Sequence, residues 1–158
     1  MIEAMTVVAG EAAPLMPRRS GVGEPLATVR TCYDHLAGRL AVALADVLQD
    51  REDIVFADGS GEVTARGQAF FAGFGLDLER KSAARRVFCR PCLDWTERRH
   101  HLAGAVGAAL CAHCVTHGWL QRTRDSRAMT ITPAGQTAFA EIFGIDAASL
   151  GRSMDRAA

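Results

Sequence analysis

The sequence has no net charge, because 18 Lys and Arg balance 18 Asp and Glu over its 158 residues. Proteins that hold nucleic acid mainly through phosphate contacts usually carry a basic surplus. No apolar run approaches the roughly 18 residues of a membrane-spanning helix, and the longest candidate, LAGRLAVALADVL, is interrupted by Arg39 and Asp46. The composition therefore disfavours nucleic-acid binding by this chain alone and predicts no membrane contact.

A secretory signal is also absent, since the N-terminus has no basic region before its apolar part and its first arginines, Arg18 and Arg19, follow that part. The chain has five cysteines, an odd number. Without an export signal, such cysteines predict reduced thiols in a cytoplasmic protein. About half of the side chains are apolar, which is enough for the core of one domain or of two small ones.

Motifs of catalysis are missing as well. The sequence has no glycine-rich phosphate loop and no strand–turn–helix nucleophile elbow. Its Cys and His pairs lack a convincing third partner for nucleophilic catalysis. We therefore predict that the protein is not an enzyme.

What the sequence does contain is a repeated phrase. RTCYDHLAG, residues 30–38, returns as RPCLDWTERRHHLAG, residues 90–104, with the six-residue insertion WTERRH. The agreement continues downstream, where Thr64, Gly67, Gln68 and Phe71 match Thr132, Gly135, Gln136 and Phe139, and FGLD matches FGID. These coincidences in one order predict an internal duplication of roughly 60–70 residues.

Helical spacing and turn residues give each copy the same predicted order of elements. Apolar residues at steps of three and four predict a long helix in residues 30–50, followed by a hairpin and a helix over 65–75. The second copy repeats this order, with its long helix closed by Gly118 and its last helix running from Pro133 to Gly144. We predict a mainly α fold with two small β-hairpins (α+β), built from tandem helix–hairpin–helix units that resemble degenerate winged helices.

The two units should pack against each other, because neither can bury its long helix alone. The second long helix has almost no polar face, so we expect it at the centre. The predicted segments are residues 1–29 (the end of a preceding helix and a linker), 30–79 (first repeat), 80–89 (connector), 90–146 (second repeat) and 147–158 (C-terminal tail).

Several phrases carry a family resemblance: RTCYDHLAGRLAVALADVL, FGLDL, RPCLDWTERRHHLAG, GWLQR and ITPAGQTAF. They resemble the C-terminal region of a subgroup of ArsR-type bacterial transcriptional regulators, and the resemblance covers residues 30–146. In that subgroup a winged helix-turn-helix before this region reads DNA. The resemblance implies an effector-sensing and oligomerising region, a homodimer, a small effector, and DNA contact only through an N-terminal domain that this sequence does not contain.

The duplicated phrases place two similar polar clusters at the predicted starts of the long helices, where the helix dipole lowers a thiol pKa. We interpret them as candidates for effector sensing, with the two aromatic residues lining a pocket. The candidates are Arg30, Cys32, Tyr33, Asp34, His35, Arg90, Cys92, Asp94, Trp95 and His101. The alternative is structural: the aspartates cap the helices and pair with the arginines, and the aromatics belong to the core.

Two patterns suit zinc or another thiophilic metal. Cys89 and Cys92, with Cys111 and Cys114 further on, have the spacing of a four-thiolate zinc site. The second pair falls in the middle of a predicted helix, however, where buried cysteine often acts as a small hydrophobic residue. His113 and His117 lie one helical turn apart beside Cys114 and can present two ligands to one side, or can simply interact with the helix dipole.

The second hairpin has a basic tip with Arg122, Arg124 and Arg127, which can contact phosphate or remain solvated. Two other functions therefore stay open beside the regulatory one. The chain can be a stand-alone metal-binding or thiol redox-sensing module, or a purely structural dimerisation piece.

Overall fold

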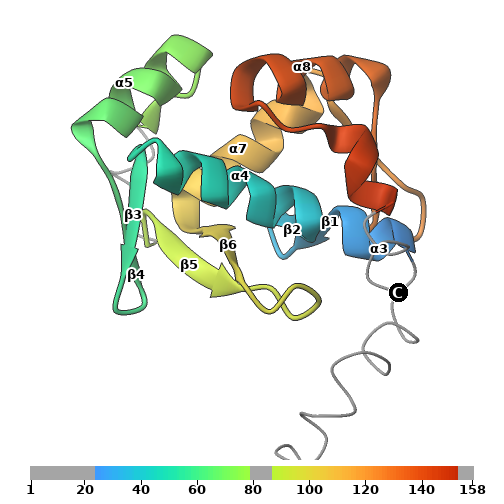
Figure 1. Ribbon diagram of the computed structural model, residues 1–158, viewed down its shortest axis with the longest axis horizontal. Coiled ribbons are helices and arrows are strands. Elements are labelled where there is room, and N and C mark those ends of the chain that lie inside the picture. The colour runs from blue at the N-terminus through green and yellow to red at the C-terminus, as the bar shows by residue number, and fades with distance from the viewer. Residues whose placement is uncertain (1–23, 79–86, 153–158) are drawn as a thin grey trace, which may run out of the picture.

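The computed structural model describes residues 24–78 and 87–152 (Figure 1). The predicted end of a preceding helix, most of the predicted connector and the last six residues lie outside the described residues. Within the described part, helices and small antiparallel hairpins alternate, which confirms the predicted α+β class.

The first repeat contains a hairpin, a long helix, a second hairpin and a shorter helix, preceded by the short helix α3 (Glu24–Thr28). These elements are β1 (Arg30–Cys32), β2 (His35–Ala37), α4 (Arg39–Asp50), β3 (Ile54–Ala57), β4 (Ser60–Val63) and α5 (Ala65–Phe74). The predicted linker in residues 1–29 therefore ends in a helical turn.

The second repeat has the same order of elements and is followed by the 3₁₀ helix η2 (Ala147–Arg152). Its elements are β5 (Arg90–Leu93), β6 (His100–Ala103), α7 (Gly104–Thr116), β7 (Leu120–Arg122), β8 (Met129–Ile131) and α8 (Pro133–Phe143). The unit that is repeated is thus hairpin–helix–hairpin–helix.

The described residues form four hairpins, whereas we predicted two. The hairpin β1–β2 occupies sequence that we had assigned to the start of the first long helix, and β6 of the β5–β6 hairpin covers the predicted start of the second. In the first repeat Tyr33 turns the chain with a φ of +58°, and α4 begins only after Gly38, whose φ is +95°. Strands of three or four residues are too short to show a clear alternation.

Glycine ends both first hairpins for the same physical reason. Gly38 and Gly104 have positive φ, and a Cβ at either position would lie within 3.0 Å of a backbone carbonyl oxygen of the preceding segment. Only glycine avoids both penalties. In each repeat the HLAG phrase therefore contains the end of a strand and a glycine that packs against the backbone of the preceding segment.

The predicted ends of the shorter helices are confirmed. The Thr64 hydroxyl oxygen accepts a hydrogen bond from the Gly67 N–H at the start of α5, and Thr132 accepts one from Gly135 at the start of α8, both at 3.0 Å. Gly75 and Gly144 end these helices in the left-handed conformation.

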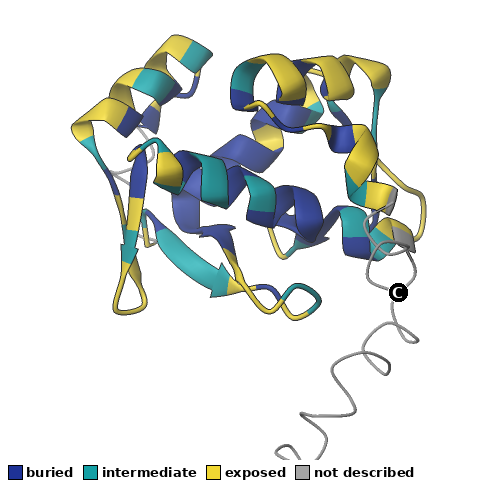
Figure 2. Cartoon of the chain, viewed as in Figure 1, coloured by how far each residue is buried: buried dark blue, intermediate teal, exposed yellow. Residues whose placement is uncertain are grey.

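The repeats exchange contacts. Helix α4 packs against β6 of the second repeat, α7 packs against β2 of the first, and β2 lies against β6. Helix α7 is buried along most of its length, as its apolar sequence predicted (Figure 2). One hydrophobic core thus contains residues of both repeats, among them Leu40 and Phe71 from the first and Val106 and Phe139 from the second.

Within the described residues, no helix combines the length and the apolar character that crossing a bilayer demands.

Candidate functional site

The first hairpins of the two repeats bring four potential ligands together: Cys32, His35, Cys92 and His101. Cys32 lies directly opposite His35 in the β1–β2 pairing, and Cys92 lies directly opposite His101 in the β5–β6 pairing. One ligand atom from each residue falls within 4.8 Å of all the others. Each repeat therefore contributes one cysteine and one histidine to a single cluster.

Strand alternation explains why these residues point inward. Neighbouring side chains on a strand lie on opposite faces, so His101 is buried while His100 is exposed. On β5 the cysteine is half-buried and the next residue, Leu93, is 58% exposed. The sequence predicted both halves of the cluster but placed them at the starts of two helices, and it did not predict that they would meet.

Both imidazole rings have the same orientation relative to the cluster. Their Nε2 atoms lie 3.1 Å apart at the centre. The Nδ1 atom of His101 lies 3.0 Å from a carboxylate oxygen of Asp94, and that of His35 lies 3.4 Å from Asp34. A carboxylate at Nδ1 fixes the ring and favours an Nδ1–H that donates to it, with Nε2 directed inward.

Asp94 is the polar centre that joins the repeats. Its fully buried carboxylate accepts hydrogen bonds from the Gly38 N–H at 2.6 Å and from Arg30 at 3.3 Å, both in the first repeat. In its own repeat it accepts from His101, from the Thr96 hydroxyl at 2.7 Å, and from the Thr96 and Glu97 N–H groups. Burial works to raise the pKa of Asp94, but these donors hold that pKa well below its usual range.

The insertion in the second repeat accounts for the difference between Asp94 and its counterpart. Thr96 and Glu97 belong to the inserted WTERRH segment, which turns around the Asp94 carboxylate. The first repeat lacks this segment, and the Asp34 side chain is 46% exposed. The insertion therefore gives the second repeat a buried anion.

The structural alternative for the aspartates needs correction. Neither long helix has a side-chain cap. Asp94 instead binds the N–H of Gly38, the residue that precedes the long helix of the other repeat, and Arg30 pairs with Asp94 across the repeats. Asp94 and Arg30 thus connect the two repeats, in addition to the hydrogen bonds that Asp94 accepts within its own repeat.

The expected lowering of the thiol pKa is wrong for Cys32. Burial raises the pKa of this thiol, and the neighbouring Cys92 raises it further. The reason is position: Cys32 lies on a strand and not at a helix N-terminus. Burial and the nearby His101 lower the pKa of His35, so its imidazole favours the neutral form that binds metal ions.

The two aromatic residues lie outside the core. Tyr33 is 94% exposed at the tip of the β1–β2 hairpin. Trp95 is half exposed, and its ring centre lies 4.8 Å from the Arg30 guanidinium carbon, which is a cation–π contact. Arg90, the counterpart of Arg30, is half-buried at the start of β5.

The remaining cysteines are not members of this cluster. Cys89, Cys111 and Cys114 are buried, and burial raises the pKa of Cys89 to about 11 and that of Cys114 to about 12. In the described part of the chain, the four residues named above form the only group of three or more His, Cys, Asp or Glu ligands suited to a metal ion. The structure therefore does not assemble the four-cysteine set suggested by spacing.

His113 and His117 pack in an aromatic cluster. Their rings stack on each other at 3.9 Å, and His113 also packs against Phe74 at 4.3 Å. Burial lowers the pKa of His113 and His117 adds to this effect. These rings are not gathered with Cys114 into a ligand set, again among the residues described.

The candidate phosphate contacts, Arg122, Arg124 and Arg127, are exposed around the β7–β8 turn. Their contact with phosphate stays a prediction.

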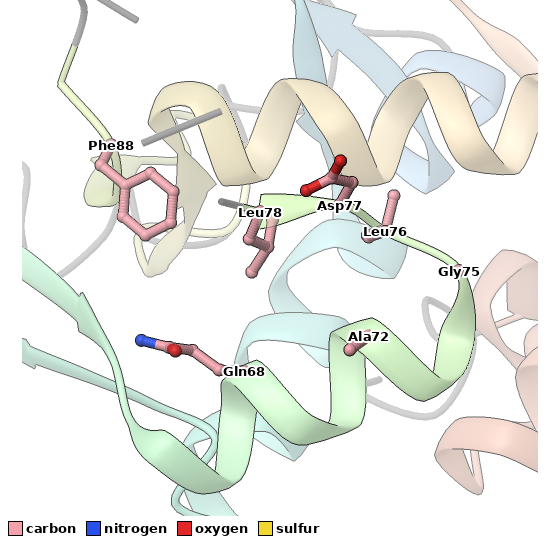
Figure 3. Close-up of a pocket in the computed structure, with 7 residues that line it drawn as sticks. All are labelled: Gln68, Ala72, Gly75, Leu76, Asp77, Leu78 and Phe88. Carbon is pink, nitrogen blue, oxygen red and sulfur yellow. The ribbon is translucent and has the colours of Figure 1, made fainter. Parts of the chain in front are cut away.

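A hollow of about 480 Å³ lies beside helix α5 (Figure 3). Gln68 and Ala72 face it from the helix, Phe88 lies across from them, and Gly75, Leu76, Asp77 and Leu78 complete its described lining. Only one of these residues, Asp77, is titratable. The inter-repeat cluster, with its convergent ligands, is therefore the stronger candidate for a functional site.

Comparison with known proteins gives one informative relative. No protein-family model and no solved structure matches the chain. The chain is 39% identical over 139 residues to YdfF of Bacillus subtilis (strain 168), described as an uncharacterized HTH-type transcriptional regulator. The match covers 88% of this chain but only 62% of that protein. Over most of its length, then, this chain is similar to part of a helix-turn-helix transcriptional regulator.

Proposed function

We propose that the chain is the effector-sensing and oligomerising region of a bacterial transcriptional regulator of the ArsR type, in which a separate helix-turn-helix domain reads DNA. The observation that carries this proposal is the 39% identity to an HTH-type regulator over 88% of the chain. The match covers 62% of the relative, so the part of the relative outside the match can contain a further domain.

The burial of α7 supports the assignment of DNA reading to another domain. In a helix-turn-helix protein the recognition helix must be exposed to enter the major groove. In the second winged-helix-like unit, α7 has the place of the recognition helix. Its residues Val106, Leu110 and Cys114 are nevertheless buried in the core. The balanced charge of the whole chain also provides no general attraction for phosphate.

The exchanged packing provides a route for sensing. Each long helix contacts the first hairpin of the other repeat, so a ligand bound between these hairpins contacts both halves at once. A ligand that prefers one packing of the repeats shifts the population toward it. In the homodimer that we propose, such a shift would reach the DNA-binding domains through their attachment to this region.

A second function is favoured by the Cys and His cluster itself. Four convergent ligands also suit a metal-binding module without any regulatory role. Both functions predict metal binding, but only the regulatory function predicts a change in transcription.

The test compares transcripts in the host with the gene for this chain deleted and with the intact gene restored. We expect RNA from neighbouring genes to change on deletion and to return on complementation. We also expect the purified chain to sediment as a dimer and to show no DNA binding by fluorescence anisotropy at physiological salt. Unchanged transcripts across a panel of added metals and oxidants would overturn the regulatory function and favour the module.

A further inference from the structure

We propose that Cys32, His35, Cys92 and His101 bind one thiophilic metal cation with tetrahedral preference, of the zinc class, and that this ion bridges the two repeats. The proposal starts from geometry. The four side chains come from two hairpins about 60 residues apart in sequence, yet their ligand atoms lie within 4.8 Å of one another.

The size of the cluster fits such an ion. Zn²⁺ binds imidazole nitrogen at about 2.0–2.1 Å and thiolate sulfur at about 2.3 Å. In a tetrahedron these lengths separate two nitrogens by about 3.3 Å and two sulfurs by about 3.8 Å. The two Nε2 atoms are 3.1 Å apart, and the upper limit of 4.8 Å for all pairs leaves only small side-chain movements to complete the geometry.

The surroundings of the histidines fit a metal site equally well. Histidine ligands usually donate their second ring N–H to a carboxylate or carbonyl, which fixes the ring. His101 does so to Asp94 at 3.0 Å, and His35 lies 3.4 Å from Asp34. Asp94 is itself held by Arg30 and by the Gly38 N–H, so the carboxylate that orients His101 is already fixed in place.

The donor set selects the chemical class of the ion. Two thiolates and two imidazoles suit Zn²⁺, Co²⁺, Cd²⁺ or Cu⁺, whereas Mg²⁺ and Ca²⁺ prefer oxygen ligands. Four protein ligands fill a tetrahedron and leave no position for a reacting water, which is the pattern of structural rather than catalytic zinc sites. The site is thus suited to holding or sensing an ion.

Bridging is the consequence for the protein. Two ligands come from β1 and β2 of the first repeat, and two from β5 and β6 of the second. A bound ion would join the repeats at the place where α4 and α7 exchange contacts. The role of this ion as the regulatory effector rests on the proposed function, whereas the binding of the ion does not.

The test uses the purified, reduced full chain after removal of metal with a chelator. Titration with Co²⁺ should give one equivalent with the intense thiolate charge-transfer absorption of tetrahedral cobalt, and Zn²⁺ should displace it. Cys32→Ser and Cys92→Ser should each weaken binding by more than the roughly 10–100-fold loss typical when a residue behind a ligand is changed. Asp94→Asn should fall within that range.

Two matched variants serve as controls. His100→Gln changes the exposed neighbour of His101 on the same strand, and Cys111→Ala removes a buried thiol of the rival four-cysteine set. Both should retain wild-type affinity. The assignment is overturned if the wild type gives no thiolate absorption, or if Cys111→Ala loses binding while Cys32→Ser keeps it.

A labelling measurement decides the matter if a ligand variant fails to fold, which circular dichroism would show. In the wild type, bound Zn²⁺ should slow maleimide labelling of Cys32 and Cys92 at least about tenfold. Equal labelling rates with and without zinc would refute the site. The metal-binding tests involve no DNA, so the absence of binding would not contradict the regulatory function. Unchanged transcripts would likewise not contradict the metal site.

Discussion

Arg30 and Asp94 form a buried ion pair between the two repeats, with Nη2 3.3 Å from Oδ1 and side-chain exposures of 1% and 0%. The same guanidinium donates to the Leu26 carbonyl at 3.0 Å and the Thr96 hydroxyl at 3.2 Å. A buried charge is tolerated when it is paired and its other polar atoms are bonded. This pair therefore depends on both repeats being in place.

Asp94→Asn should lower the free energy of unfolding by about 3–5 kcal/mol, because it leaves the buried Arg30 without its counter-ion. Urea unfolding of the reduced protein in the presence of a chelator measures the change without a metal contribution. Asp58→Asn is the control, since Asp58 is exposed at the tip of the β3–β4 hairpin, and it should change stability by no more than about 0.5 kcal/mol. Equal effects of the two variants would contradict the bridging role of Asp94.

Much of the fold could be predicted from the sequence because its signals are local. The capping residues Thr64 and Thr132 and the terminal glycines Gly75 and Gly144 act through bonds within a few residues. The repeat itself needed only the comparison of one half with the other. The first hairpins were missed because their strands have three or four residues each and lead directly into apolar helices.

The candidate site could be predicted only in part. The cysteines and histidines were identified because the duplicated phrases contain them. Their meeting depends on the exchange of contacts between repeats, since His35 and His101 belong to different copies and lie 66 positions apart. For the cysteines with zinc-like spacing the sequence left two alternatives open, and the burial of Cys111 and Cys114 in α7 agrees with the second, in which they act as small hydrophobic residues of the core.

Gly107 should be intolerant of substitution, although it lies inside a helix. A Cβ there would lie 2.5 Å from the Leu102 carbonyl oxygen and 3.3 Å from the His35 Cβ. Leu102 lies on β6 and His35 on β2, so Gly107→Ala should push α7 away from β6, and to a smaller extent from β2, and lower the free energy of unfolding by about 1–3 kcal/mol. Thermal or urea unfolding measures this loss.

The matched control for Gly107 is Gly73, which lies within helix α5 and has no atom within 4 Å of an added Cβ. Gly73→Ala should raise stability by about 0.5–1 kcal/mol, because alanine is the better helix former. A stabilising Gly107→Ala would show that α7 does not approach Leu102 of β6 and His35 of β2 as closely as the structure has it.

The buried thiol of Cys114 should make stability fall as the pH rises. Burial raises the pKa of this thiol from 9.0 to about 12 in the folded protein. Between these values the folded chain keeps its proton while the unfolded chain loses it, so increasing pH favours unfolding. One such group contributes a slope of about −1.4 kcal/mol per pH unit, and the stability it provides below pH 9 is lost progressively above it.

Comparison of variants isolates this contribution from other groups that titrate in alkali. Urea unfolding of the reduced wild type and of Cys114→Ala at several pH values from 8 to 11 should give a shallower slope for the variant. Val106→Ala removes methyl groups from another buried position of α7, so it should lower stability by a similar amount at every pH and keep the wild-type slope. Parallel slopes for all three proteins would mean that Cys114 ionises as readily in the folded chain as in the unfolded one. Because burial raises the pKa of a thiol, that result would contradict the position of Cys114 in the core.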